Sequence, residues 1–287
     1  MAENSQEQEQ QQQPERSLTA LFGGSELSHH PSRWNACWEE ERTPWDRGGP
    51  SMALSDLLPF LPPATTLGSQ KKPLTALVPG CGRGHDVLLL ASFGFDTVGL
   101  DVSERAMAEA RKNAESIDMD EVYPLKGEVK QQRGTYKFLV GDFFTQDWVA
   151  ESGVEGGKFD LIFDYTIVKF GCALPPSARP AWAQRYRDLL APLGRLVCLE
   201  FPSTKDPKEP GPPWAMNPHT YVAHLGHPGE EVATDEHGGV LKDKVEPPRD
   251  DGLMRLLHTK PPRTHAAGYK DGQVVDCISI WCHTAAA

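Results

Sequence analysis

The middle of the chain alternates between short apolar runs and longer stretches with helical periodicity. The apolar runs have the length and residue types of buried strands, and they are Leu74–Val78, Thr97–Asp101, Tyr136–Val140, Phe159–Phe163 and Gly194–Phe201. The helical patterns between them are His85–Phe93, Ser103–Asn113, with Ser103 as a favourable N-cap, and Arg179–Ala191. Strands that alternate with helices in this way predict a parallel sheet joined by right-handed crossovers.

Two further strand patterns, Leu253–Thr259 and Val274–Trp281, follow near the end of the sequence. No long helical pattern separates them, so we expect an antiparallel hairpin added to the parallel sheet. The complete pattern predicts an α/β fold. We expect a Rossmann-like, mostly parallel seven-stranded sheet with helices on both faces and a C-terminal antiparallel hairpin.

The remaining segments carry weaker patterns. Residues 1–17 are polar and rich in Gln, which predicts a disordered tail ahead of a single domain over residues 18–287. Leu18–Leu27 and Ser51–Leu61 are expected to form short helices, and Ile117–Thr135 a loop. The stretch 202–252 is rich in Pro, Gly and charge, which predicts a long functional loop or lid inserted in the domain.

Composition and net charge limit the classes of molecule that the protein is expected to bind. The net charge of −11 disfavours attraction to nucleic acid or anionic lipid, and no apolar run approaches the roughly 20 residues of a membrane span. The six cysteines form no CxxC pair and the ten histidines show no metal-ligand spacing. We therefore expect a cytoplasmic monomer with buried free thiols and no metal, which acts on a small molecule.

The stretch LVPGCGRGHDV is the main candidate for ligand binding. It places Gly80, Gly82 and Gly84 between an apolar strand and a helix, where backbone without Cβ atoms can approach a ligand closely. No Lys-Ser/Thr pair follows, which excludes a P-loop, and His85 follows Gly84 directly. The alternative ligand, NAD(H), is disfavoured because the GxGxxG spacing of its third glycine is missing.

Carboxylates follow the next two predicted strands. Asp101 lies 21 residues after Gly80, where a carboxylate in a βαβ unit can accept both ribose hydroxyls. Asp142 can accept from an adenine amino group, and Phe143 can pack on the ring. Together these features fit a nucleoside without a diphosphate, S-adenosylmethionine (SAM). Each feature also has a purely structural alternative. The glycines could only form a tight turn, Asp101 could be the N-cap of the next helix, and Asp142 could cap a turn.

Tryptophans gather in PSRWNACWEEERTPWDRGGP. Trp34 and Trp38 are four residues apart and share one face if this segment is helical, and Trp45 follows in a Pro- and Gly-rich turn. An indole face over the sulfonium of SAM would be worth about 0.5–2 kcal/mol. The alternative interpretation is that these side chains only attach an N-terminal helix to the sheet.

These motifs carry a family resemblance. In order along the chain they are W-x3-W-x6-W-D-x-G, LVPGCGRGHDV, GLDVSE, GDFF, FDLIFDYT, CALPPSARPAWA, LLAPLGRL and GPPW. Over Trp34 to Trp214 the chain resembles the plant and fungal thiol (halide) methyltransferases of the thiopurine S-methyltransferase superfamily. The resemblance implies a class I SAM-dependent methyltransferase fold.

The resemblance also implies which residues form the site. The residues implied to line the SAM site are Trp34, Trp38, Trp45, Gly80, Asp101, Asp142 and Phe143. We assign Cys81, Gly82 and Val102 to the same site. Tyr165 occupies the position that faces the methyl acceptor in this family. The expected acceptor is a small thiol, hydrosulfide, thiocyanate or halide.

Methyl transfer to such an acceptor needs mainly alignment and a dry pocket. A thiol with a pKa near 8.5 is partly ionised at neutral pH, so a dedicated base is not required. Tyr165 could orient the nucleophile, and Asp164 could fix the methionine amine or the tyrosine. Alternatively, Asp164 only forms a turn and Tyr165 only packs against its neighbours. Cys81 and Cys172 are expected to be packed thiols.

One departure from the family pattern affects the acceptor side. About three extra residues, Ile167–Lys169, separate DYT from CAL beside the expected acceptor pocket. Two alternatives therefore stay open. The acceptor could be a nitrogen or oxygen of a small metabolite, or the protein could bind SAM with impaired turnover.

Overall fold

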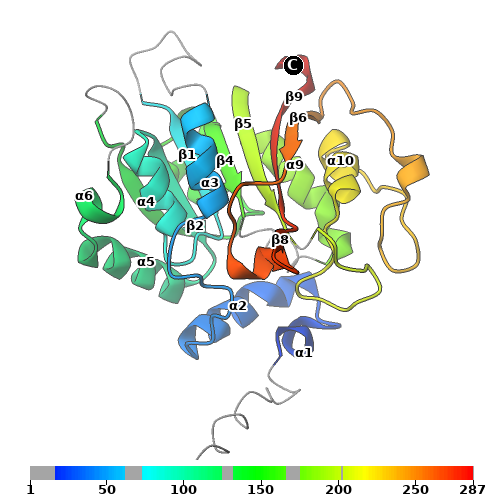
Figure 1. Cartoon of the computed structure of the whole chain (residues 1–287), viewed down its shortest axis with the longest axis horizontal. Coiled ribbons are helices and arrows are strands. Elements are labelled where there is room, and N and C mark those ends of the chain that lie inside the picture. The colour runs from blue at the N-terminus through cyan, green and yellow to red at the C-terminus, as the bar shows by residue number, and fades with distance from the viewer. Residues whose placement is uncertain (1–16, 62–72, 125–131, 166–174, 202, 287) are drawn as a thin grey trace, which may run out of the picture.

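The computed structural model describes residues 17–61, 73–124, 132–165, 175–201 and 203–286. A seven-stranded sheet with the order β3-β2-β1-β4-β5-β9-β6 forms its centre (Figure 1). Its strands are β1 (Thr75–Pro79), β2 (Asp96–Asp101), β3 (Tyr136–Val140), β4 (Phe159–Asp164), β5 (Leu190–Glu200), β6 (Leu253–Thr259) and β9 (Cys277–His283). Strands β1 to β5 are parallel, which confirms the predicted fold class.

Strand register brings the carboxyl ends of the first three strands to one edge. Pro79 at the end of β1 lies opposite Leu100, and Asp101 at the end of β2 lies opposite Val140 at the end of β3. The turns that follow these strands therefore emerge side by side. In open α/β sheets this edge is where ligands bind.

The C-terminal hairpin is present as predicted. Strand β9 pairs antiparallel with β5, with Val197 opposite Ile280, and also antiparallel with β6, which is the edge strand. The second strand begins later than expected, at Cys277. Residues Gln273–Val274 belong instead to β8, which pairs with β7 (Tyr269–Lys270) in a separate small sheet.

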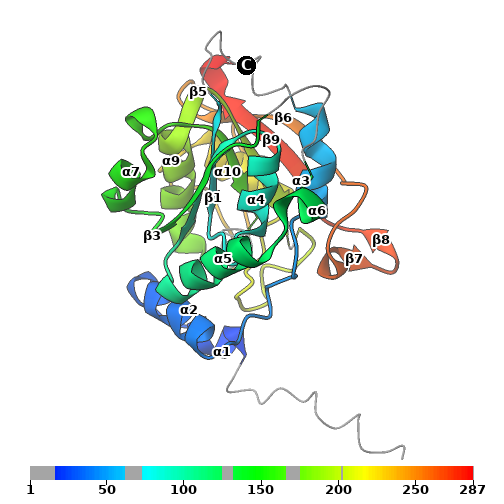
Figure 2. The same ribbon diagram turned by 90° about the vertical axis from the view of Figure 1, so that its left-hand side faces the viewer.

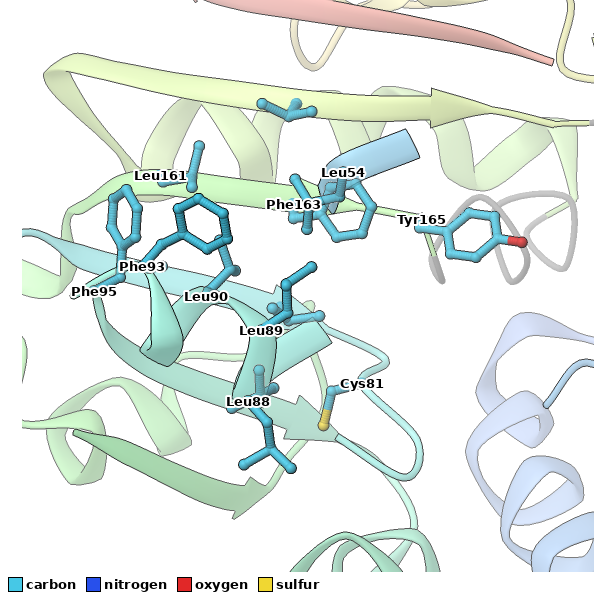
Figure 3. Close-up of a cluster of buried hydrophobic side chains, with 14 of the residues drawn as sticks. Leu54, Cys81, Leu88, Leu89, Leu90, Phe93, Phe95, Leu161, Phe163 and Tyr165 are labelled. Carbon is cyan, nitrogen blue, oxygen red and sulfur yellow. The ribbon is translucent and has the colours of Figure 1, made fainter. Parts of the chain in front are cut away.

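Helices cover both faces of the sheet (Figure 2). On one face lie α3 (Met52–Leu57), α4 (His85–Ser92) and α5 (Glu104–Ser116), whose apolar side chains form a core with Leu161, Phe163 and their neighbours (Figure 3). On the other lie α7 (Asp147–Ser152), α9 (Arg179–Leu189) and α10 (Pro218–Gly226), packed around Trp148, Trp182 and Tyr221. Burying both faces explains why the central strands read as nearly continuous apolar runs.

Two short helices precede the sheet. Helices α1 (Leu18–Phe22) and α2 (His30–Glu39) lie across the carboxyl edge of the strands (Figures 1 and 3). The first is shorter than predicted, and a 3₁₀ turn over Leu27–His29 follows it. The helical placement of Trp34 and Trp38 is confirmed, and both indoles are buried.

Helices occur in two stretches that we expected to be loops. Helix α6 (Met119–Val122) lies within 117–135, and the side chain of Asp118 caps it by accepting from the amides of Asp120 and Glu121. Helix α10 lies within 202–252 and is capped by Asn217. Pro218 and Gly226 resemble loop residues, but proline is favourable in the first turn of a helix. No helix in the described ranges is both long and apolar enough to cross a bilayer.

Candidate functional site

The glycine turn between β1 and α4 is shaped by backbone conformation. Gly80, Gly82 and Gly84 all have positive φ, at 63°, 52° and 75°, which side chains other than glycine rarely adopt. A Cβ on Gly84 would lie 2.5 Å from Cε1 of Phe138, and one on Gly82 would lie 3.3 Å from Cζ2 of Trp38. The turn therefore needs glycine because its φ angles are positive and because Phe138 and Trp38 leave little room for a Cβ atom.

Asp101 ties this turn to the end of β2. Its carboxylate accepts a hydrogen bond from the Gly82 amide (3.1 Å) at one oxygen and from the Ser103 amide (3.0 Å) at the other. Only 3% of the residue is exposed. Burial raises the pKa of Asp101 to about 6, although the backbone hydrogen bonds oppose this shift. Each oxygen keeps further acceptor capacity toward a ligand.

A cavity of about 320 Å³ lies above the carboxyl ends of β1, β2 and β3. It brings together the predicted residues Trp34, Gly80, Asp101, Val102, Asp142 and Phe143. The opposite wall consists of Leu27, Ser28, His30 and Pro31, which sequence reasoning missed. Sequence periodicity gave only a weak signal for these residues because the chain enters α2 there through a 3₁₀ turn.

Asp142 and Phe143 sit in a firmly held turn after β3. One oxygen of Asp142 accepts from the Phe144 amide (2.9 Å), so this residue caps the turn as well as lining the cavity. The indole N–H of Trp148 donates to the Asp142 carbonyl (3.0 Å), and the Arg185 guanidinium donates to the Phe143 carbonyl (2.7 Å). These bonds fix the wall that Phe143 presents to the cavity.

The predicted tryptophans form one cluster. The ring of Trp45 lies edge-on to Trp34, with centroids 5.2 Å apart, and edge-on to Trp38, at 6.1 Å. Trp34 also stacks on Phe22 of α1, at 4.1 Å, so it attaches the N-terminal helices to the site. These indoles pack together, as the alternative interpretation expects, and they also line cavities, so an indole face over the cofactor stays a prediction.

Two smaller cavities share lining residues with the first. One, of about 180 Å³, is lined by Leu18, Trp34, Pro44, Trp45, Arg47, Phe201, Pro212 and Pro213. The other, of about 40 Å³, contains Trp38, Cys81, Gly82, Tyr165 and His265 among its lining residues. Gly80 is shared between this second space and the largest cavity, and Trp45 and Arg47 are shared between the two smaller ones.

Tyr165 and Asp164 are not brought together. Side chains of consecutive strand residues point to opposite faces, and Tyr165 lines the small cavity while Asp164 is fully buried on the other side. There Asp164 accepts a hydrogen bond from the indole of Trp182 (3.2 Å). It lines none of the three cavities described above, so we do not retain the predicted role of orienting Tyr165.

Burial determines the proton state of the other groups in the small cavity. It raises the pKa of Tyr165, and the nearby Arg47 offsets only part of that shift. It also raises the pKa of the Cys81 thiol well above its usual range, which agrees with a packed, unreactive thiol. Tyr165 is therefore a protonated hydrogen-bond donor at neutral pH.

The described residues fit SAM. The cavity of about 320 Å³ pairs a buried carboxylate with apolar walls, as a ribose and an adenine require. The Nε1 atom of Trp38 is buried without a hydrogen-bond partner among the described residues, so a ligand carboxylate could satisfy it. Within the described ranges no cluster of His, Cys, Asp or Glu could hold a metal. Ile167–Lys169 and Cys172 lie outside these ranges.

Comparisons with known proteins agree with this geometry. The model of the thiopurine S-methyltransferase family matches residues 29–282. Thiocyanate methyltransferase 1 of Arabidopsis thaliana is 36% identical over 208 residues, which cover 71% of this chain and 77% of the relative. Probable thiol methyltransferase 2 of the same plant is 37% identical over 188 residues, covering 66% and 69%.

A solved structure shares the fold. The SAM-dependent methyltransferase from Anabaena variabilis superposes with a TM-score of 0.51 at 14% sequence identity, covering 88% of this chain and 94% of that one. This likeness supports the class I methyltransferase architecture of the sheet. With the family model spanning both the nucleoside cavity and Tyr165, the chain belongs to the thiopurine S-methyltransferase family.

Proposed function

We propose that this SAM-dependent methyltransferase transfers its methyl group to a small sulfur nucleophile or a similar soft anion. A thiol, hydrosulfide and thiocyanate are the leading acceptors, followed by halides. The observation that carries the proposal is the arrangement of three neighbouring cavities that share lining residues. A nucleoside-sized space at the carboxyl edge and an aromatic-walled space share Trp34 as a lining residue.

The proposed cofactor contacts follow from the cavity walls. Asp101 would accept from the ribose hydroxyls, while Val102 and Phe143 would enclose the adenine ring. Trp38, Cys81 and Gly82 would line the methionine portion. When bound, SAM supplies a methyl group on a cationic sulfur, which the neighbouring indole faces of Trp34 and Trp45 would favour.

The acceptor would occupy the space of about 180 Å³, with its nucleophilic atom toward the Tyr165 side of the small cavity, which shares Trp45 and Arg47 with this space. An apolar cavity of about 150 Å³ is enough for benzene, so this space admits a small organic thiol as well as an inorganic anion. Arg47 provides a positive charge in an otherwise apolar wall, which suits an anionic nucleophile. The relatives that methylate thiocyanate or thiols, by their names, support the same acceptor class.

An assay panel tests this proposal. Purified protein and SAM are incubated with iodide, thiocyanate, hydrosulfide, small thiols and amine- or hydroxyl-bearing metabolites, and methylated products are measured. Methyl thioether or methyl thiocyanate formation supports the proposal. Methylation confined to nitrogen or oxygen acceptors would overturn it, and SAM binding without any turnover would indicate a binding protein.

We also propose that the protein acts as a cytoplasmic monomer. Support comes from the free thiols of Cys37, Cys81, Cys198, Cys277 and Cys282, which suit a reducing compartment. Sedimentation velocity on the full chain tests the oligomeric state, and a dimer would contradict it.

A further inference from the structure

His265 faces the acceptor side of the site although it lies far from the glycine turn in sequence. It sits on the connection between β6 and β9, and its ring stacks on Tyr165 with centroids 5.5 Å apart and planes 11° apart. Both side chains line the small cavity that also contains Gly80 and Arg47. An imidazole is therefore placed beside Tyr165, in a cavity that shares Trp45 and Arg47 with the proposed acceptor space.

The segment that carries His265 is anchored on both sides. The guanidinium of Arg263 donates to both carboxylate oxygens of Asp56 on α3, at 3.0 and 2.5 Å. The hydroxyl of Thr264 donates to Asp276 (2.5 Å), and both residues are almost fully buried. A Cβ on Gly268 would lie only 2.0 Å from the same Asp276 carboxylate. This packing fixes the position of His265 at the cavity.

The acidic groups around the cavity are already engaged. Asp46 forms an ion pair with Arg83 and accepts from the Gly48 amide (3.0 Å). Asp86 accepts from the amide of Ser51 (2.7 Å).

The remaining proton-transfer groups are also poorly suited to act as a base. His85 pairs through Nδ1 with the Tyr123 hydroxyl (3.1 Å), and burial lowers its pKa. Tyr165 and Cys81 stay protonated because burial raises their pKa values. Imidazole is the side chain that exchanges protons most readily near neutral pH, and the His265 ring lies against Tyr165 in the same cavity.

We propose that His265 is the general base that accepts the proton of a neutral thiol acceptor, an inference that rests on the proposed function. The S–H bond breaks, the proton moves to a ring nitrogen of His265, and the electron pair stays on sulfur. That sulfur bonds to the methyl carbon as the bond from this carbon to the cofactor sulfur breaks. His265 then releases its proton to solvent. Thiocyanate and iodide carry no proton and need no such step.

This difference between acceptors provides the test. At pH 6.5 only about 1% of a thiol with a pKa near 8.5 is ionised, so a base can accelerate its reaction by up to about 100-fold. We expect His265→Gln to lower kcat/KM for a small alkyl thiol by about 10- to 100-fold at this pH. With thiocyanate the change should stay within about twofold. His237→Gln, which alters a histidine outside all three cavities, is the matched control and should change neither rate.

Two measurements without turnover complete the experiment. Calorimetry should give the same affinity for S-adenosylhomocysteine (SAH) in wild type and His265→Gln. Thiophenol added to the SAH complex, at a pH where it is mostly protonated in solution, should show thiolate absorbance with wild type and much less with the variant. Equal slowing with both acceptors, no slowing with either, or loss of SAH affinity overturns the role of His265. Wild type that methylates neither acceptor overturns the proposed function itself.

Discussion

The nucleoside end and the acceptor end of the site are built in different ways. The nucleoside cavity is formed mainly by turns that directly follow β1, β2 and β3, and these emerge together because the strands are parallel and in register. The acceptor space collects residues such as Leu18, Arg47, Phe201 and Pro213 from distant parts of the chain. In the proposed function, cofactor binding would thus depend on the sheet, whereas acceptor choice would depend on loops that can vary independently.

The largest expected effect is at the nucleoside end. Asp101→Ala should weaken SAM binding by about 1.5–3 kcal/mol, or roughly 10- to 150-fold, because charged hydrogen bonds to ribose are lost. Isothermal titration calorimetry measures this change, and the KM for thiocyanate should stay the same. Because Asp101 also holds the amides of Gly82 and Ser103, Asp101→Asn serves as the milder companion variant. Unchanged SAM affinity in both variants would remove Asp101 from the site.

At the acceptor end we expect acceptor binding to weaken while cofactor binding stays the same. Arg47→Met should raise the KM for thiocyanate by about tenfold, since an anion loses a charged partner, and should leave the affinity for SAH unchanged. Steady-state kinetics and calorimetry separate the two effects. Arg105→Met on α5 removes an exposed guanidinium and is the matched control. If Arg47→Met weakens SAH binding instead, Arg47 belongs to the cofactor side.

Acid should weaken SAM binding. The Asp101 carboxyl has a pKa of about 6, so at pH 5 most molecules carry it protonated, and the affinity for SAM should fall by somewhat less than tenfold. Since the folded-state pKa is raised, protonation favours the folded protein, and ionisation between about pH 4 and 6 costs stability. The loss of affinity is therefore not acid unfolding caused by this group. Asp101→Asn should flatten the profile, and an unchanged slope would contradict the assignment.

The smallest expected effect tests whether an indole attracts the positive charge on the sulfur of SAM. Trp34→Leu should weaken SAM binding by about 0.5–1 kcal/mol more than SAH binding, because only SAM carries a sulfonium for the indole to attract. Competition binding with both ligands gives this difference directly. An equal loss for SAM and SAH, or a loss of thermal stability alone, would leave Trp34 with its packing role against Phe22.

The sequence predicted most of the sheet and many of the residues that line the cavity of about 320 Å³. Periodicity located the central strands, and Gly80 and Asp101 stood at recognisable positions in one βαβ unit. Helix α10 was missed because Pro218 and Gly226 resemble loop residues. Asp164 ends β4 and is buried against Trp182, whereas Tyr165 follows the strand and lines the small cavity.

The acceptor end could not be predicted because its contacts span long sequence separations. Arg47 follows the last tryptophan of the cluster, and His265 comes from the segment between β6 and β9. Neither residue stands in a pattern that links it to Tyr165. Only the folded chain stacks His265 on that ring.

The central claim is that SAM lies across the carboxyl ends of β1, β2 and β3, with its ribose on Asp101. A crystal structure of the SAH complex tests this most directly. We predict electron density for adenosine in the cavity of about 320 Å³, with both ribose hydroxyls within hydrogen-bond distance of Asp101 and adenine against Phe143. Density for SAH elsewhere, or a ribose held by other groups, would contradict the account.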